Sequence, residues 1–312
     1  MKLSVNLKNL KSANWLDVHQ VHRYQHPAMA TIFEAFVFHP DRRYAQQAVQ
    51  SAFNEIDTLE QELSRFIENS DINRINQLAI HEPIKVGPDT FTCLQICKQI
   101  YEQTYGCFDI SVGMLVDLWK SGEAATKRTA KTRLQIIEKT GMEYLVLNNK
   151  DYSVQLLKTG LQLDLGGFGK GYALDRMAAI LSEWGITCAM VHSGFSTVLA
   201  LAAPGEENGW PISITHPLSH KIIKHISVVH SAVSGSGLQK GAHIIDPRTS
   251  KPVQNRLAAW SVAQSAAVAD ALSTAFMIMP IRQIKKYILQ HPEISACVIL
   301  KKESGIVSFG LM

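Results

Sequence analysis

Residues 163–175 read LDLGGFGKGYALD and place four glycines within six positions, between a predicted strand at 161–165 and a predicted helix at 170–184. Glycine lets backbone N–H groups approach a ligand closely, and a helix N-terminus offers orphan donors and the positive end of the helix dipole. With the mobile cation of Lys170, these features favour a phosphate site. The alternative is a tight strand–helix turn with a solvated lysine, because the stretch matches neither a Walker A loop nor a GxGxxG fingerprint.

The patterns on both sides of this stretch predict a mixed α+β protein. Apolar residues at helical spacing predict helices at 42–66, 71–75, 88–105, 170–184, 266–279 and 281–290. β-prone runs bounded by turn residues predict strands at 29–38, 144–147, 154–157, 161–165, 188–192, 197–201, 211–215, 222–229, 258–263, 296–300 and 306–309. Without a repeat or linker, this order favours helices packed on antiparallel sheet.

The bulk composition is that of a globular protein with a large core. Of 312 residues, 46% are hydrophobic and 19% are charged, which argues against disorder. The formal charge of +4 is spread along the chain without a basic block, so we expect no nucleic-acid partner. No apolar run has the length of a signal peptide or a membrane span, and the five cysteines are odd in number and scattered. We therefore expect no membrane segment and a cytoplasmic location.

A second candidate lies in residues 268–279, VADALSTAFMIM, where Asp270 and Thr274 stand four apart on a predicted apolar helix. Side chains at this spacing share one helix face. A carboxylate and a hydroxyl on one face make a half-site for a hard cation such as Mg²⁺. The alternative is local: Asp270 caps or pairs nearby, and Thr274 bonds back to a carbonyl.

Two further segments carry polar residues beside turns. Residues 242–249, AHIIDPRT, hold a His, an Asp and an Arg that either contact a charged ligand or belong to a structural hairpin turn. Residues 106–119, GCFDISVGMLVDLW, place Asp109 after a helix stop at Gly106. Asp109 is either a helix N-cap or an acid that holds the hydroxyls or ring edge of a ligand.

These four segments, in this order, resemble the ApbE family of flavin transferases over about residues 28–280. The boxes that carry the resemblance are Met29-Ala30-Thr31, Leu63-Ser64-Arg65-Phe66, Ser70-Asp71-Ile72 with Ile75-Asn76, Gly106 to Asp109, Leu115 to Trp119, Asp164 to Tyr172, His243 to Thr249 and Ala269 to Ala275. In the family's Asp-Leu-Gly-Gly-Ile-Ala-Lys-Gly-Tyr box, Phe168 and Gly169 are substitutions. So many boxes in register are not a coincidence.

The resemblance implies an α+β fold of the ApbE-like, T-fold-related architecture, with helices packed on antiparallel sheets and a flavin cleft between subregions. Residues 1–27 would be an N-terminal extension and 28–312 the flavin transferase domain. The positions that match family contacts to FAD are Met29, Asp109, Gly166, Lys170 and Ile245. The positions that match metal ligands are Asp270, Thr274 and the backbone carbonyl of Gly169. His243 matches a histidine thought to take the proton of the acceptor hydroxyl.

The activity implied is a Mg²⁺-dependent FAD:protein FMN transferase, which attaches FMN through a phosphoester to a Ser or Thr of a target flavoprotein and releases AMP. Two alternatives stay open: an FAD-binding protein without turnover, and an FAD pyrophosphatase that gives FMN and AMP. The sequence departs from the family where Phe195 replaces a glycine, in the short loop 238–242, and at Ser250. These departures alter the rim near the acceptor or flavin ring, whereas the phosphate and metal positions are kept.

Overall fold

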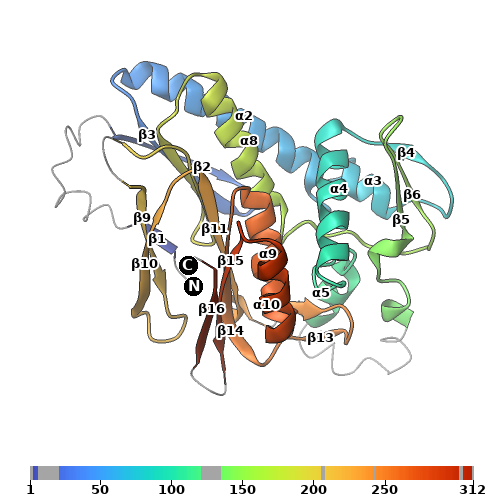
Figure 1. Cartoon of the computed structure of the whole chain (residues 1–312). Coiled ribbons are helices and arrows are strands. Elements are labelled where there is room, and N and C mark those ends of the chain that lie inside the picture. Colours follow the sequence, from blue (N-terminus) through green and yellow to red (C-terminus); the bar gives the residue numbers. More distant parts are fainter. Residues whose placement is uncertain are drawn as a thin grey trace.

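The computed structural model describes residues 3–5, 21–120, 135–204, 208–241, 243–301 and 305–310. Its centre is an eight-stranded antiparallel sheet (Figure 1). From edge to edge the strands are β16 (Ile306–Phe309), β15 (Ser295–Leu300), β14 (Arg256–Ala263), β11 (Ser231–Gly237), β8 (Thr197–Ala200), β7 (Ala189–Ser193), β3 (Thr31–Phe38) and β2 (Val21–Ala28). This order places β11 and β8 in the middle of the sheet, where all of β8 and residues 232–235 of β11 are buried.

One face of this sheet is covered by helices. They are α2 (Arg42–Leu63), α8 (Gly169–Glu183), α9 (Ala266–Ile278) and α10 (Ile281–Gln290). α2 buries Val49, Phe53 and Ile56, which recur at helical spacing on one side of the helix. α9 packs against both α8 and β11. The two helices cross closely, because a Cβ on Gly171 would lie 2.3 Å from the carbonyl oxygen of Ala266.

The opposite face is covered by a three-stranded antiparallel sheet of β1 (Leu3–Val5), β9 (Trp210–Thr215) and β10 (Ile222–Val228). A second core fills the space between the two sheets, with Trp210 and Trp260 fully buried. Residues 21–27, part of the expected N-terminal extension, form most of β2 and pair with β3. The structure also describes β1 of the expected extension, whereas residues 1–2 and 6–20 lie outside the described residues.

A smaller subregion lies beside α9 (Figure 1). Its elements are α3 (Asp71–Asn76), α4 (Pro88–Gln103), α5 (Gly113–Lys120), η2 (Met142–Tyr144), and the three-stranded sheet of β4 (Ile84–Lys85), β6 (Ser153–Leu156) and β5 (Leu145–Asn148). The chain between β11 and β14 adds η3 (Leu238–Lys240) and the pair β12 (Ile245–Asp246) and β13 (Lys251–Pro252). None of the described helices is long and apolar enough to cross a membrane.

The predicted mixed α+β architecture is confirmed, and most predicted elements are present within a few residues of their expected bounds. The strand predicted at 161–165 is wrong, because only Gln162 makes an isolated bridge there, with Val112. The N–H and the carbonyl of Leu163 bond to the side-chain amide of Asn76, so a side chain takes the place of a strand partner. β11 was not predicted as a strand, because its small Ser and Gly residues have low β-propensity.

Candidate functional site

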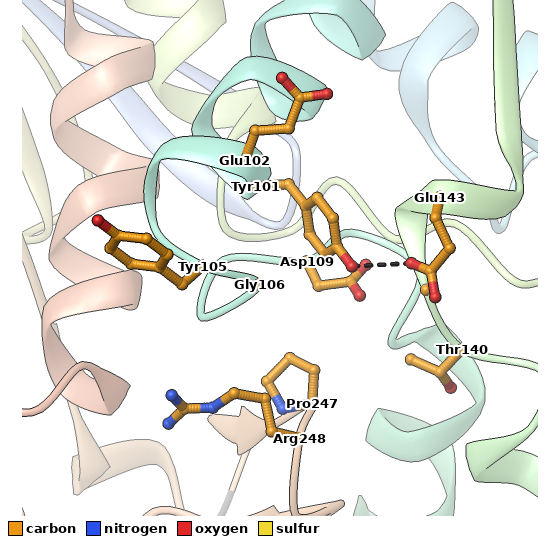
Figure 2. A pocket seen from close by; sticks show the side chains of 10 residues that line it. Tyr101, Glu102, Tyr105, Gly106, Asp109, Thr140, Glu143, Pro247 and Arg248 are labelled. Carbon is orange, nitrogen blue, oxygen red and sulfur yellow. Dashed lines mark hydrogen bonds between the residues drawn. The ribbon is translucent and has the colours of Figure 1, made fainter.

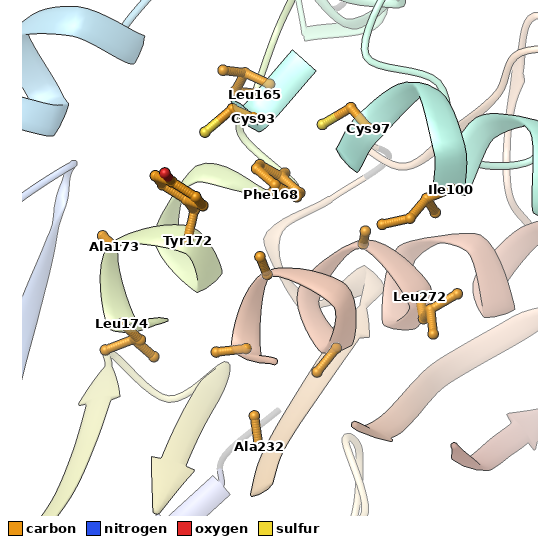
Figure 3. Packing of buried hydrophobic residues seen from close by; sticks show 14 of the residues in the cluster. Cys93, Cys97, Ile100, Leu165, Phe168, Tyr172, Ala173, Leu174, Ala232 and Leu272 are labelled. Atoms are coloured by element: carbon orange, nitrogen blue, oxygen red, sulfur yellow. The ribbon is translucent and has the colours of Figure 1, made fainter. Parts of the chain in front are cut away.

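The glycine-rich turn is shaped by its own side chains. Asp164 Oδ1 accepts a hydrogen bond from the N–H of Gly166 at 2.8 Å, and α8 then begins at Gly169. Lys170 lies in the first turn of α8 and donates from Nζ to the carbonyl oxygen of Gly166 at 2.6 Å. Phe168 is fully buried beneath the turn and packs with residues of α4 and α9 (Figure 3). The turn is therefore fixed from below, and its lysine folds back over the glycines rather than standing in solvent.

Arg65 connects this turn to α5. Its guanidinium lies 3.0 Å from Asp164 Oδ2 and makes a two-pronged pair with Asp117. The Arg65 side chain is only 7% exposed and that of Asp164 17%, so this pair is largely shielded from water, whereas Asp117 is 57% exposed at the other end. Since Asp164 caps the glycine turn with its other oxygen, Arg65 holds the carboxylate that gives the turn its shape.

Asp270 projects from α9 between the sheet and the glycine turn. Its Oδ1 accepts a hydrogen bond from Ser234 Oγ at 3.1 Å, with Thr197 Oγ1 at 3.5 Å. Its Oδ2 is buried and has no hydrogen-bond partner among the described residues. The nearest cation recorded for that oxygen is Lys170 Nζ, at 3.8 Å. A buried carboxylate oxygen left without a donor is costly unless a cation compensates it.

Thr274 lies one helical turn after Asp270 and faces the glycines. Its Oγ1 is 3.0 Å from Ser236 Oγ, and a Cβ on Gly167 would come within 3.4 Å of it. Asp270 and Thr274 therefore bond to strand β11 rather than capping locally or bonding back within α9. Gly169, the third expected metal ligand, is buried, and a Cβ there would meet only Leu165, at an ordinary 3.9 Å. An alanine at this position, as in the family box, would therefore fit.

The donor set suits a hard divalent cation. The described residues include no group of three or more His, Cys, Asp or Glu side chains that could hold a metal. A cation beside Asp270 would therefore bind one carboxylate and neutral oxygens, from the Thr274 hydroxyl and the Gly169 carbonyl. Mg²⁺ is commonly held by one or two carboxylates together with phosphate oxygens and water. The uncompensated Oδ2 of Asp270 fits this chemistry.

The N-terminus of α9 is fixed by a carboxylate from α8. Asp175 accepts hydrogen bonds from the N–H groups of Ala266 and Ala267 and from the hydroxyl of Ser265. Burial raises the pKa of Asp175. This contact locks the helix that carries Asp270 to the helix that carries Lys170.

A pocket of about 320 Å³ opens beside this centre (Figure 2). Its polar lining includes Asp109, Arg248, Tyr101 and Glu143. The Tyr101 hydroxyl donates a hydrogen bond to Glu143 Oε2 at 2.8 Å. Asp109 Oδ1 accepts bonds from the N–H and the hydroxyl of Ser111. Asp109 is buried, and this desolvation raises its pKa to about 6. α5 begins four residues later, so Asp109 is not that helix's N-cap.

The pocket and the glycine turn are joined through the backbone. The N–H of Asp164 donates to the carbonyl oxygen of Ile110 at 2.7 Å, directly after Asp109. The ring of Phe108 would lie 3.9 Å from a Cβ on Gly167. Asp109 in the pocket lining is therefore one residue from a segment that bonds directly to the glycine turn, and all four segments singled out in the sequence meet in this region.

The 243–250 segment contributes one wall of the pocket. Asp246 accepts a two-pronged pair from Arg248, and its carbonyl accepts the N–H of Ser250. Ile245 is buried against α5 rather than lining the pocket. His243 Nδ1 lies 3.0 Å from the carbonyl oxygen of Gly241. A hydrogen on Nδ1 would be donated to that carbonyl, and the basic lone pair would then be on Nε2.

Met29 occupies the tight turn between β2 and β3. Met29 and Ala30 both have positive φ angles, 47° and 56°, as a two-residue hairpin turn of this kind requires. Met29 is half-buried against the main core. The neighbouring turn contacts this hairpin, because the N–H of Gly194 donates to the carbonyl oxygen of Ile32. Phe195, in that same turn, is 58% exposed.

The sequence alone assigned no role to several residues of the site, although Arg65 and Asp164 lie within the boxes that carry the family resemblance. Ser234, Ser236 and Thr197 contact the Asp270–Thr274 pair, and Asp164 with Arg65 shapes the turn. The alternation of Ser234 and Ser236 is visible as VSGSG, but it acquires meaning only once β11 is known to face α9. Arg65 and Asp164 are 99 positions apart, and no local pattern joins them.

Comparison with known proteins agrees with this architecture. The sequence profile described as "ApbE family" matches residues 29–298. A FAD:protein FMN transferase of Escherichia coli K12 is 26% identical over 277 residues, covering 83% of this chain and 79% of the relative. A FAD:protein FMN transferase of Buchnera aphidicola is 28% identical, covering 80% and 77%. The crystal structure of the Thermotoga maritima ApbE protein superposes with a TM-score of 0.82 at 25% identity, covering 92% and 96% of the chains.

Proposed function

The chain belongs to the ApbE family, and we propose that it is a Mg²⁺-dependent FAD:protein FMN transferase. It takes FAD as its substrate, attaches FMN through a phosphoester to a Ser or Thr of an acceptor flavoprotein, and releases AMP. The relatives named FAD:protein FMN transferase support the reaction. The observation that supports it most directly is the buried Oδ2 of Asp270, which faces the glycine turn and lacks a hydrogen-bond donor among the described residues.

The pyrophosphate of FAD would lie over the glycine turn. The N–H of Gly166 bonds to Asp164 and those of Phe168 and Gly169 bond to Leu165, so the other N–H groups of the turn and of the first turn of α8 would supply the donors. Lys170 supplies a positive charge. Asp270, Thr274 and the carbonyl of Gly169 would hold Mg²⁺, which when bound neutralises charge on the pyrophosphate oxygens. Lys170 would then turn from Gly166 toward a phosphate oxygen.

The pocket beside Asp109 would take another part of FAD. An ionised Asp109 accepts hydrogen bonds from ligand hydroxyls or a ring edge, and Arg248 offers donors on the opposite side. Met29 and Ile245 are the remaining proposed FAD contacts; Ile245 would act through the pocket wall, because its side chain is buried against α5.

The proposed step is an in-line displacement at the FMN-side phosphorus. The acceptor hydroxyl oxygen forms the new P–O bond, and the bond from that phosphorus to the bridging oxygen breaks, so AMP leaves with the bridging oxygen. His243 takes the hydroxyl proton, which suits an imidazole because its ordinary pKa lies near neutral pH. General-base catalysis of this kind contributes typically about 10²–10⁴-fold.

The test is to incubate the purified protein with FAD and Mg²⁺, with and without a Thr-bearing acceptor protein, and to measure AMP, free FMN and protein-bound flavin. The proposal expects AMP and protein-bound FMN in equal amounts, and only when the acceptor is present. Free FMN and AMP without an acceptor would identify a pyrophosphatase instead. Bound FAD with no AMP under either condition would identify a binder without turnover.

A further inference from the structure

Two serines of β11 each contact one member of the proposed metal-ligand pair. Ser234 Oγ lies 3.1 Å from Asp270 Oδ1, and Ser236 Oγ lies 3.0 Å from Thr274 Oγ1. Both serines stand on the face of β11 that packs on α9. Ser234 is fully buried, so water cannot substitute for its hydroxyl.

The match between strand and helix is geometric. Residues two apart on a strand point to the same side and are about 6.6 Å apart. Residues four apart on a helix share a face and are about 6 Å apart along its axis. Ser234 and Ser236 therefore have nearly the same spacing as Asp270 and Thr274, and one hydroxyl can serve each ligand without distortion.

The neighbouring hydroxyls of Thr197 and Ser273 give Ser234 and Ser236 further hydrogen-bond partners. Thr197 Oγ1 lies 2.8 Å from Ser234 Oγ, so Thr197 can donate to Ser234 while Ser234 donates to Asp270. On the other side, Ser273 donates to the backbone carbonyl of Asp270, and Ser236 Oγ lies 2.8 Å from Ser273 Oγ. Ser236 can therefore donate to Ser273 and accept from Thr274.

This arrangement leaves the ligand atoms available. Asp270 uses Oδ1 for the serine and keeps Oδ2 toward the glycine turn. With Thr274 donating its single hydrogen to Ser236, the lone pairs of the Thr274 oxygen remain for a cation. Hydrogen bonds of this kind around metal ligands fix their orientation and typically change metal affinity by about 10–100-fold.

We propose that Ser234 and Ser236 are positioning residues, which orient Asp270 and Thr274 for a divalent cation through one hydroxyl contact each. This inference rests on the proposed function, because it takes Asp270 and Thr274 as the metal ligands. β11 is then a template for the metal site, although it supplies no ligand itself.

The experiment measures metal binding directly. Mn²⁺ is titrated into the full chain without acceptor, and free Mn²⁺ is followed by electron paramagnetic resonance for the wild type, Ser234→Ala, Ser236→Ala and the double variant. FAD affinity in the absence of metal is measured by quenching of flavin fluorescence. We expect each single variant to raise the Mn²⁺ dissociation constant by about 10-fold or more, and FAD affinity without metal to change by less than about 3-fold.

Ser261→Ala is the matched control. Ser261 pairs with Ser234 across β14 and β11, is fully buried, and bonds to the carbonyl of Ala269 on the same helix. It therefore removes a buried hydroxyl contact with α9 without touching either ligand. If Ser234→Ala does not fold, Ser234→Cys, which keeps the shape and weakens the donor, replaces it and is expected to shift Mn²⁺ affinity in the same direction.

Two failures are distinguishable. If Asp270→Ala binds Mn²⁺ as the wild type does, the metal site itself is misplaced, and both the proposed function and this inference are overturned. If Asp270→Ala loses Mn²⁺ while the serine variants match Ser261→Ala, the metal site stands and the positioning role is overturned.

Discussion

The two ends of the candidate site are built in different ways. The phosphate end, residues 164–170 with Asp270 and Thr274, consists of backbone, buried hydroxyls and one carboxylate, packed between α8, α9 and β11. The pocket end, Asp109 and Arg248 with their neighbours, is lined by side chains from turns and helix ends around an open volume of about 320 Å³. A pyrophosphate is a compact anionic group, so a rigid backbone cradle suits it. The rest of the ligand and the acceptor call for adjustable side chains.

The comparison predicts the largest effect at the phosphate end. Asp270→Ala removes the one carboxylate among the proposed metal ligands, and a metal that stabilises transition-state charge contributes several kcal/mol. We expect Mg²⁺-dependent AMP release to fall by about 10³-fold or more. The measurement is AMP formation at saturating FAD across a Mg²⁺ series. An unchanged rate would remove the metal assignment.

The next effect concerns His243, which precedes the pocket-wall residues Pro247 and Arg248 in the chain. As the general base for the acceptor hydroxyl, His243→Asn should keep FAD and metal binding yet slow transfer by about 10²–10⁴-fold. The wild-type rate should fall at low pH as one imidazole takes up a proton, and the variant should lose this limb of the pH profile. The measurement is the initial rate of acceptor flavinylation from pH 5 to pH 9.

A purely structural His243 would behave differently. Its ring lies close to the carbonyl of Gly241, so the alternative role is to order the turn that leads to Ile245. The variant would then bind FAD poorly and melt at a lower temperature, with an unchanged pH profile for the remaining activity. Full affinity together with full transfer would contradict both roles.

The sequence was informative about this site where chemistry depends on local spacing. Asp270 and Thr274 stand four apart, and the glycines with Lys170 stand between an extended segment and a helix, so each group is visible as a motif. The contacts between these groups were not predictable, because Ser234 and Ser236 lie on a strand whose small residues give no β pattern. This segment is a central strand because of its tertiary contacts, and the local hydrophobic periodicity of a sequence does not reveal such contacts.

Gly166 and Lys170 contribute to the glycine turn in different ways. A Cβ on Gly166 would lie 2.9 Å from Asp164 Oδ1, so Gly166→Val would displace the carboxylate that caps the turn and block close approach of a phosphate. We expect FAD affinity to fall by about 10-fold or more, at least as much as for Lys170→Ala, which removes one partly exposed cation. Titration of flavin fluorescence with both variants measures this. Unaltered affinity in the valine variant would argue against a phosphate cradle here.

The smallest effect on ligand binding is expected at the pocket end. There, the ionised Asp109 lowers the stability of the fold, and the same carboxylate is proposed to accept hydrogen bonds from FAD. Burial raises the pKa of Asp109 to about 6 from an ordinary value of 3.8, so the folded protein holds this proton more tightly than the unfolded chain. The stability that this group contributes is therefore complete below about pH 4 and is lost as the pH rises to about 6. A shift of this size corresponds to about 3 kcal/mol at neutral pH.

Asp109→Asn removes this loss, because an amide does not ionise and its oxygen can still accept the bonds from Ser111. We expect the variant to be more stable than the wild type at pH 7.5 by up to about 3 kcal/mol, with the difference vanishing near pH 4. Its amide would present a donor to the pocket where the carboxylate presents an acceptor, so FAD affinity should fall by about 10-fold. Urea unfolding at both pH values, paired with FAD titration, separates the two effects. A variant that gains stability and keeps full affinity would show that Asp109 makes no contact with the ligand.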